Sequence, residues 1–405
     1  GGTYTLLTST NPISNAGAHT ITGQTIGRVT LTPTILANSI TVGSSVYEGM
    51  WNQTGGGNGS SGNPNMTQDN WTGYKPTVAG DAALFGSSIV DPSTVVVDTP
   101  HVVGFMRFEN ANAYTIGANG SSNLTLSNGS SNAVITVTAG SHTIAENVSL
   151  ISNLDLLPAA NTTLTMSGVI SGASKNVEVN GAGSVELSGA NTYSGVTAVS
   201  NGTLTLSGAR TVASGAFSIG TVPAQDAILN ISAGTYALGA NAMNVGNAPT
   251  TAATATVNQS GGAISFTSGN ALLLGQNTVG NKGIYNLSGG SITTFASTTR
   301  GIILGVNSNL TPGVNSGGGT FNLSDAGVIN MTSANGGGGN ATLQIGRSDT
   351  VANNTTNAFN QTGGTANVGI LTLGGAASGS SGVDAKLNLT KIGRASCRER
   401  VSSPV

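Results

Sequence analysis

The chain has 405 residues and a net charge of −2, and only 7% of its residues are charged and 4% aromatic. Long helices are rich in Ala, Leu, Glu, Lys and Arg, so this composition excludes a helical bundle. Nucleic-acid binding is disfavoured because it requires a basic patch, and no apolar run reaches the ~18–20 residues of a membrane-spanning helix. The hydrophobic residues, 38% of the total, occur in short, regularly spaced runs, which predicts an ordered all-β protein.

The first residues carry neither an initiating Met nor a basic-then-apolar signal segment, so we expect the sequence to start inside a longer protein. Residues 1–46 contain short β-prone runs and are assigned to the end of a preceding β-helix block, the fold that the later repeats predict. Residues 47–100 form an irregular introductory segment with Trp51 and Trp71. These tryptophans are expected to cap an end of the fold or pack under a loop; the alternative is an exposed stacking platform for sugars.

Residues 101–215 include a repeat that is clearest between positions 161 and 208. Its landmarks are Gly181-Ala182-Gly183, Leu187–Gly195 (LSGANTYSG) and Asn201–Leu206 (NGTLTL). Together these motifs resemble the passenger-associated β-strand repeat of bacterial autotransporters, with Val196 where the family usually has a second glycine. The resemblance implies an exported, right-handed parallel β-helix, and the handedness comes from the resemblance alone.

Residues 216–390 carry a second repeat, in which an asparagine recurs within an apolar strand. The spacings between successive asparagines are 28, 28, 36, 38 and 28 residues. The recurring residues are Asn230, Asn258, Asn286, Asn322, Asn360 and Asn388. Between them lies another apolar strand that ends in glycine, at Gly246, Gly275, Gly305, Gly346 and Gly374. This period predicts one solenoid coil per repeat, with Gly-rich and Asn-rich corners.

A single coil cannot fold alone, because ordering the backbone costs ~1–2 kcal/mol per residue and a few apolar side chains do not offset it. Stacked coils share ladder hydrogen bonds and a continuous core. The sequence therefore predicts one elongated β-solenoid.

Two interpretations exist for the recurring asparagine. All six lie in Asn-x-Ser/Thr, a glycosylation pattern. The equivalent position in every coil favours a structural role, an internal ladder in which each amide donates to the next. On this interpretation we expect Asn286→Ala to lower the thermal midpoint more than Asn281→Ala in a presumed corner.

The last segment, 391–405, changes character and contains the only cysteine, Cys397. Its first eleven residues, KIGRASCRERV, match a common short-read sequencing adapter when back-translated, so we interpret the segment as a sequencing artefact. Ser402–Val405 are not explained this way. The alternatives are a native basic tail and a reactive Cys397 beside arginines.

Catalysis on a β-helix would require clustered carboxylates or a calcium site. The best candidate pairs are Asp91 with Asp98 and Glu178 with Glu186, and alternation predicts that both glutamates point outward as solvated residues. Their spacing of eight residues also allows a position on neighbouring strands. The three histidines (His19, His101, His142) are far apart in the sequence. We therefore expect no catalytic residue, no metal and no cofactor.

Three Thr-x-Thr pairs offer a further hypothesis. Stacked on a flat face, they could order water as ice-binding solenoids do, although Thr is also a common outward strand residue. The pairs are Thr136/Thr138, Thr163/Thr165 and Thr203/Thr205.

The function expected from the sequence is a non-catalytic structural or adhesive β-helix stalk, extracellular or on the outer cell surface, as a fragment of a larger chain. Its partners would be glycans or cell surfaces, with no nucleic acid and no membrane insertion by this segment. The translocator or anchor would lie outside the fragment. The alternatives are a polysaccharide-active β-helix enzyme, a lyase or hydrolase, and a spacer of a larger exported enzyme.

Overall fold

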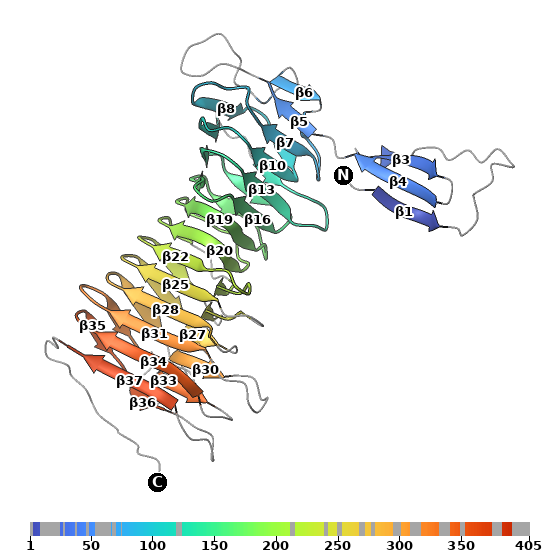
Figure 1. The fold of residues 1–405 in the computed structure, drawn as a ribbon. Helices are drawn as coiled ribbons and strands as arrows, with labels where there is room; N and C mark the ends of the chain where they lie inside the picture. Colours follow the sequence, from blue (N-terminus) through green and yellow to red (C-terminus); the bar gives the residue numbers. More distant parts are fainter. Residues whose placement is uncertain are drawn as a thin grey trace.

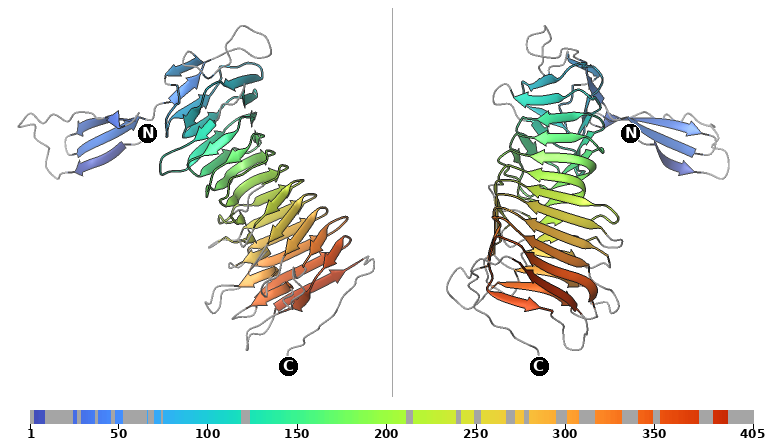
Figure 2. Two further views of the ribbon diagram at one scale, coloured as in Figure 1. Left: turned by 180° about the vertical axis from the view of Figure 1, so that it is seen from behind. Right: turned by 60° about the vertical axis from the view of Figure 1, so that its left-hand side comes forward.

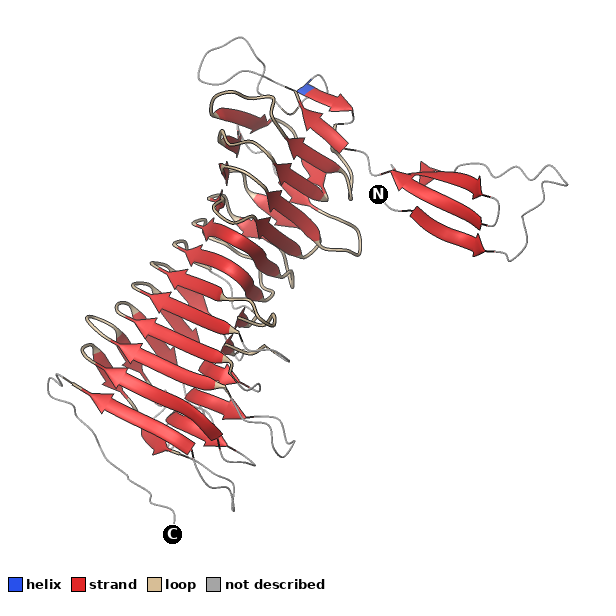
Figure 3. Cartoon of the chain, in the orientation of Figure 1, coloured by secondary structure: helices blue, strands red, loops and turns tan. Residues whose placement is uncertain are grey.

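The fold is built from short strands that recur three to a coil and pair in parallel with the strands of the next coil (Figure 1). The computed structural model describes residues 3–8, 25–26, 29–36, 39–45, 48–52, 66, 70–73, 75–118, 124–210, 215–238, 242–248, 253–266, 272–276, 280–294, 301–307, 317–331, 341–348, 353–374 and 383–390. Within these residues no helix is long and apolar enough to span a membrane, and the short blue piece in Figure 3 is a 3₁₀ turn at Asn70.

The coils have three faces, each a stack of parallel strands. The first face contains β8 (Ser93–Val97), β11 (Tyr114–Ala118), β14 (Ser141–Ile144), β17 (Thr163–Met166), the second halves of β19 (Val177–Leu187) and β20 (Thr197–Leu206), β22 (Ala227–Ile231), β25 (Thr254–Gln259), β28 (Lys282–Leu287), β31 (Gly318–Leu323), β34 (Asn353–Gln361) and β37 (Val383–Leu389).

The second face is made of shorter strands in two sheets, which isolated parallel bridges at Arg210 connect to each other. Its strands are β9 (His101–Val103), β12 (Leu124–Leu126), β15 (Val148–Leu150), β18 (Ile170–Ser171), β23 (Thr235–Ala237), β26 (Ala263–Phe266), β29 (Ser291–Thr294), β32 (Val328–Asn330) and β35 (Thr365–Asn367).

The third face completes each coil, and the coils stack along the whole body as seen in Figure 2. Its strands are β5 (Glu48–Trp51), β7 (Ala82–Phe85), β10 (Phe105–Phe108), β13 (Ala133–Val137), β16 (Leu154–Pro158), the first halves of β19 and β20, β21 (Phe217–Ile219), β24 (Met243–Val245), β27 (Leu272–Gln276), β30 (Ile302–Asn307), β33 (Thr342–Ser348) and β36 (Ile370–Leu373).

This arrangement confirms the all-β parallel β-helix expected from the sequence; the right hand of the coil stays a prediction of the family resemblance. Stacking continues past residue 215, where the two kinds of repeat meet. It also starts earlier than residue 101, because β7 and β8 of the introductory segment already belong to the first coil.

The start of the chain differs from the expectation. Within residues 1–46, strands β1 (Thr3–Thr8), β2 (Thr25–Ile26), β3 (Val29–Leu36) and β4 (Ser39–Ser45) form an antiparallel sheet in the order β1-β4-β3-β2 and not parallel coils (Figure 1). Only two residues separate β3 from β4, which suffices for a hairpin but is far too short for a parallel connection.

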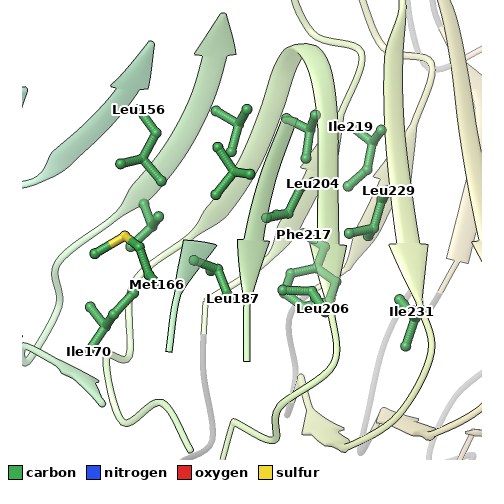
Figure 4. Close-up of a cluster of buried hydrophobic side chains, with 14 of the residues drawn as sticks. Leu156, Met166, Ile170, Leu187, Leu204, Leu206, Phe217, Ile219, Leu229 and Ile231 are labelled. Carbon is green, nitrogen blue, oxygen red and sulfur yellow. The ribbon is translucent and has the colours of Figure 1, made fainter. Parts of the chain in front are cut away.

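The core is one continuous file of apolar side chains along the inside of the coils. It forms because successive strand residues point to opposite sides, so alternate residues of every strand face inward. Figure 4 shows this packing where the two kinds of repeat meet, with Leu204, Leu206, Leu229 and Ile231 among the buried residues. Farther along, Tyr285, Phe321 and Phe359 stack with ring centroids 5.1 and 5.4 Å apart.

The recurring glycines lie at or near the ends of the third-face strands: Gly246 and Gly374 directly follow β24 and β36, whereas β27, β30 and β33 continue one or two residues past their glycine. Gly246, Gly275, Gly305, Gly346 and Gly374 all have a positive φ, between 65° and 74°. At Gly275 an added Cβ would lie 2.3 Å from the carbonyl oxygen of Gly318. The corner therefore requires both the left-handed backbone and the close approach that only glycine allows.

Candidate functional site

One outward column of polar side chains runs along the whole first face. Its members are in register because each pairs with the equivalent residue of the next coil. We call this set the polar column: Thr94, Thr115, Thr143, Thr165, Glu186, Thr205, Asn230, Asn258, Asn286, Asn322, Asn360 and Asn388.

The six asparagines form the amide half of the polar column, and hydrogen bonds connect them in sequence. Each Nδ2 donates to the Oδ1 of the preceding asparagine, at 3.0, 2.8, 2.7, 2.8 and 2.7 Å. The first of them, Asn230, donates to Thr205 Oγ1 at 3.5 Å. The ladder bonds use one amide N–H and one oxygen lone pair of each interior residue, which favours the structural interpretation over glycosylation.

The location of the ladder differs from the expectation. The sequence analysis placed it inside the coils, but Asn230 through Asn360 are half-buried on the outer side and Asn388 is exposed. The reason is strand alternation: Leu229 and Ile231 are fully buried, so Asn230 between them must point outward. A second outward pair, Asn367 donating to Asn330 at 2.8 Å, lies on the second face and was not predicted.

The other end of the column carries hydroxyls in place of amides. Thr94 is exposed, and Thr115, Thr143 and Thr165 are half-exposed. Alongside them runs a parallel outward column, in register through the same coils: Ser141, Thr163, Ser184 and Thr203. We call these eight residues, together with Glu186 and Thr205, the hydroxyl half. Within the described part of the chain, none of the eight side-chain hydroxyls has a protein hydrogen-bond partner.

The structure places the three predicted threonine pairs on different faces of the coils. Thr163/Thr165 and Thr203/Thr205 share the first face, with Ser184 and Glu186 in the coil between them. Thr136 instead lies on the third face, in register with Arg107 and Leu157. The three pairs therefore do not form one array.

Acidic residues of the coils are held by neighbouring polar groups. Glu178 and Glu186 both face outward, as predicted, but they lie on the same strand, β19, and not on neighbouring strands. That strand turns a corner at Gly181, where an added Cβ would lie 2.2 Å from the carbonyl oxygen of Pro158. Ser200 Oγ donates to Glu178 at 2.5 Å and Ser207 Oγ to Glu186 at 2.7 Å.

One juxtaposition of acids was missed by the sequence analysis: Asp155 pairs in register with Glu178 of the next coil. Asn132 Nδ2 lies 3.0 Å from both carboxylate oxygens of Asp155. The residues that the structure describes contain no group of three or more His, Cys, Asp or Glu side chains placed to hold a metal ion. Asp91 is exposed, and Asp98 lies 3.7 Å from His101.

The histidines have structural surroundings where they are described. Both His101 and His142 are buried, at 0% and 2% exposure, and burial lowers the pKa of each. The backbone N–H of Tyr114 donates to His142 Nδ1 at 3.0 Å, so this ring must be neutral, with its Nε2–H donating to the carbonyl oxygen of Ala139 at 2.7 Å. His19 lies outside the described residues, as does the segment 391–405 with Cys397.

Both tryptophans of the introductory segment are buried, so they offer no platform for sugars. Trp51 and Trp71 are 1% and 4% exposed and pack edge to face at 5.4 Å, against Phe85 of the first coil. Strand β6 (Trp71–Gly73) pairs antiparallel with β5 above β7. This hairpin closes the amino-terminal end of the core.

A buried cation at the junction of the two repeats was also missed. Arg210 is 2% exposed, and its guanidinium carbon lies 4.7 Å from the ring centroid of Phe217 and 5.3 Å from that of Tyr193. Its Nη1 donates to Thr197 Oγ1 at 2.7 Å. A lone arginine in a polar stretch gives no sequence signal of burial, because its inward position depends on the bridges to Asn191 and Tyr236.

Comparison with known families matches residues 177–215 to the Passenger-associated-transport-repeat. The match covers β19, β20 and Arg210, the junction between the hydroxyl and amide halves, and confirms the autotransporter passenger repeat recognised in the sequence. No curated protein and no solved structure matches the chain significantly.

Proposed function

We propose that this chain is a non-catalytic β-helix stalk of an exported bacterial protein, secreted or displayed on the outer cell surface, with a structural and adhesive role. The passenger-associated repeat at residues 177–215 carries the proposal, because repeats of this name belong to the transported part of autotransporters. Glycans or cell surfaces are the partners, reached through the outward faces of the coils.

The continuous geometry of the coils supports a mechanical role. Parallel pairing runs from β7 to β37, and one apolar core extends through the coils. A stacked repeat transmits contacts only between neighbours, so it makes a rod whose length follows the number of coils. Such a rod suits presentation at a distance from the membrane.

Surface display tests this proposal. The chain would be placed between a secretory signal and an autotransporter translocator in a Gram-negative host, and its exposure measured with external protease and antibody on intact cells. We expect display at a level similar to a known passenger, with protease-resistant coils. Retention inside the cell with normal folding of the purified chain would contradict an exported role.

The competing function is a polysaccharide lyase or hydrolase, for which the pair Asp155 and Glu178 supplies the most plausible acids. Incubation with pectin, alginate and xylan, followed by assays for unsaturated products and reducing ends, tests it. We expect no turnover. Turnover that is lost in Glu178→Gln would establish the enzyme instead. The third alternative, a spacer for a catalytic domain elsewhere in the protein, predicts the same inactivity for this chain.

A further inference from the structure

The hydroxyl half presents a regular grid of hydrogen-bonding groups on four successive coils. The pairs are Ser141/Thr143, Thr163/Thr165, Ser184/Glu186 and Thr203/Thr205, and a core residue points inward between the two members of each pair. Strands in a sheet are about 4.8 Å apart, and alternate residues along a strand about 6.6 Å apart. The grid therefore repeats at short, fixed intervals along the axis of the coils.

Most groups of the grid have no hydrogen-bond partner within the described protein. Of its eight groups, Thr205 accepts a hydrogen bond from Asn230 and Glu186 accepts one from Ser207. The six remaining hydroxyls have no protein partner among the residues that the structure describes. The amide half differs, because its side chains bond to one another. Of the two halves, the hydroxyl half is therefore the one whose side chains are mostly without a partner in the described protein.

The charge of the grid favours a neutral polymer over an anionic one. Its two columns contain no lysine or arginine, and Glu186 is their one charged residue. An anionic polymer finds no counter-charge here and meets a carboxylate. A neutral sugar instead supplies hydroxyls that donate to Glu186 and to the threonine oxygens, and bonds to a carboxylate are the stronger kind.

We propose that the hydroxyl half binds a neutral, extended polysaccharide that lies across the strands, along the axis of the coils. The inference deepens the proposed adhesive function and rests on it. A linear polysaccharide repeats its hydroxyls at a regular interval, so one chain meets the same two side chains in coil after coil. Each hydrogen bond exchanged with water is individually weak. Affinity therefore comes from the number of coils engaged, as in multivalent binding.

Binding of the full chain to insoluble polymers tests the proposal. The probes are microcrystalline cellulose and chitin as neutral polymers, with pectate and alginate as anionic ones, and the readout is depletion of protein from solution. The blocking variant is Thr165→Arg, in the centre of the grid. The matched control is Thr125→Arg on the second face. Thr125 is also a half-exposed, outward threonine, and its hydroxyl has no hydrogen-bond partner among the described residues.

We expect retention on a neutral polymer and none on the anionic ones, with Thr165→Arg weakening retention about tenfold and Thr125→Arg leaving it unchanged, since only the first interrupts the run of contacts. Soluble oligosaccharides of the same polymer should compete better per sugar as they lengthen. Equal thermal midpoints of the two variants show that the fold is kept.

Three outcomes overturn the proposal: no retention on either neutral polymer, equal loss in both variants, or competition that is independent of oligosaccharide length. Ice-growth inhibition or self-association that is lost in Thr165→Arg, without polymer binding, assigns the grid to ice or to a second copy of the chain. The display experiment tests the exported stalk independently of polysaccharide binding. A chain that reaches the surface without binding a neutral polymer refutes the binding proposal for the grid and leaves the proposal of an exported stalk intact.

Discussion

The hydroxyl half and the amide half occupy the same outward register of the same face, yet their side chains interact with different partners. In the amide half each Asn bonds to the Asn one coil away, whereas Thr115, Thr143 and Thr165 face solvent. An amide carries a donor and an acceptor on opposite sides, so it spans the distance between strands. A hydroxyl is shorter, and the described hydroxyls of Thr115, Thr143 and Thr165 make no bond from coil to coil. The choice of residue in one column thus decides whether the face stabilises itself or stays available to a ligand.

The largest expected effect is a loss of stability, and it tests which asparagines stabilise the amide half. Asn281 is fully buried, donates to the carbonyl oxygens of Ala248 and Gln276 at 2.9 and 2.8 Å, and accepts from Ala253 N at 3.1 Å. Asn281→Ala leaves these three backbone groups without their partner and should cost about 3–5 kcal/mol. Chemical denaturation followed by circular dichroism measures it.

This reverses the order expected from the sequence, where Asn281 was a presumed corner of little consequence. From the structure we expect Asn281→Ala to be more damaging than Asn286→Ala. A smaller loss for Asn281→Ala than for Asn286→Ala would show that the corner contacts are dispensable.

At the junction between the halves, Arg210→Ala should cost about 2–4 kcal/mol, because it removes a buried side chain packed between Tyr193 and Phe217 and leaves a cavity. Arg210→Met fills most of that volume without a charge and should stay within about 1 kcal/mol of the parent, since buried charges are often replaceable by apolar groups. Measuring the free energy of unfolding of both variants shows whether the packing or the charge of Arg210 is required. Equal losses would mean that the charge itself, and not the packing, is required.

The direct comparison of the halves uses one alanine in each. Asn286→Ala removes the bonds to Asn258 and Asn322 and should cost about 1–3 kcal/mol. Thr165→Ala removes an outward hydroxyl with no protein partner and should change stability by less than about 0.5 kcal/mol. Thermal midpoints of the two variants provide the test, and indistinguishable midpoints would refute the division into a self-bonded half and a free half.

The smallest expected effect is a response to acid through the buried histidines, including His142 on β14, the strand that carries Ser141 and Thr143. The pKa of His142 is lowered by burial, so the unfolded chain takes up this proton more readily than the folded one. Stability is therefore full above the ordinary value of 6.5 and is lost as the pH falls below it. We expect the free energy of unfolding, measured by chemical denaturation at each pH, to be lower at pH 5 than at pH 7.

The matched variant for the acid response is His142→Asn, in which the side-chain oxygen still accepts from the N–H of Tyr114 but does not titrate. It should reduce the acid sensitivity, although His101, also buried with a lowered pKa, contributes in the same direction. An unchanged pH profile in His142→Asn would assign the response to other groups.

The repeated signals in the sequence predicted the coils well, and solitary residues were the ones that escaped. The regular recurrence of Asn, and of the Gly after each apolar run, predicted the coil and the amide bonds between coils. Alternation around Asn230 already contained the outward direction, so the expectation of an internal ladder was avoidable. The register of the hydroxyl grid could not be predicted in this way, because the corners between its strands vary in length from coil to coil. Arg210 likewise depends on contacts that no local pattern encodes, whereas the antiparallel start follows from the two-residue gap between β3 and β4, a hairpin spacing that the sequence analysis did not use.

The amide ladder also has a direction. Every Nδ2 donates toward the amino-terminal coil, so the five amide–amide bonds align head to tail from Asn388 to Asn230. Bonds that align in this way polarise one another, which strengthens each through its neighbours. A break in the middle of the row therefore weakens bonds on both sides, whereas a break at either end weakens one side only. The row behaves as a cooperative dipole, and its resistance to disruption should rise faster than the number of coils it joins.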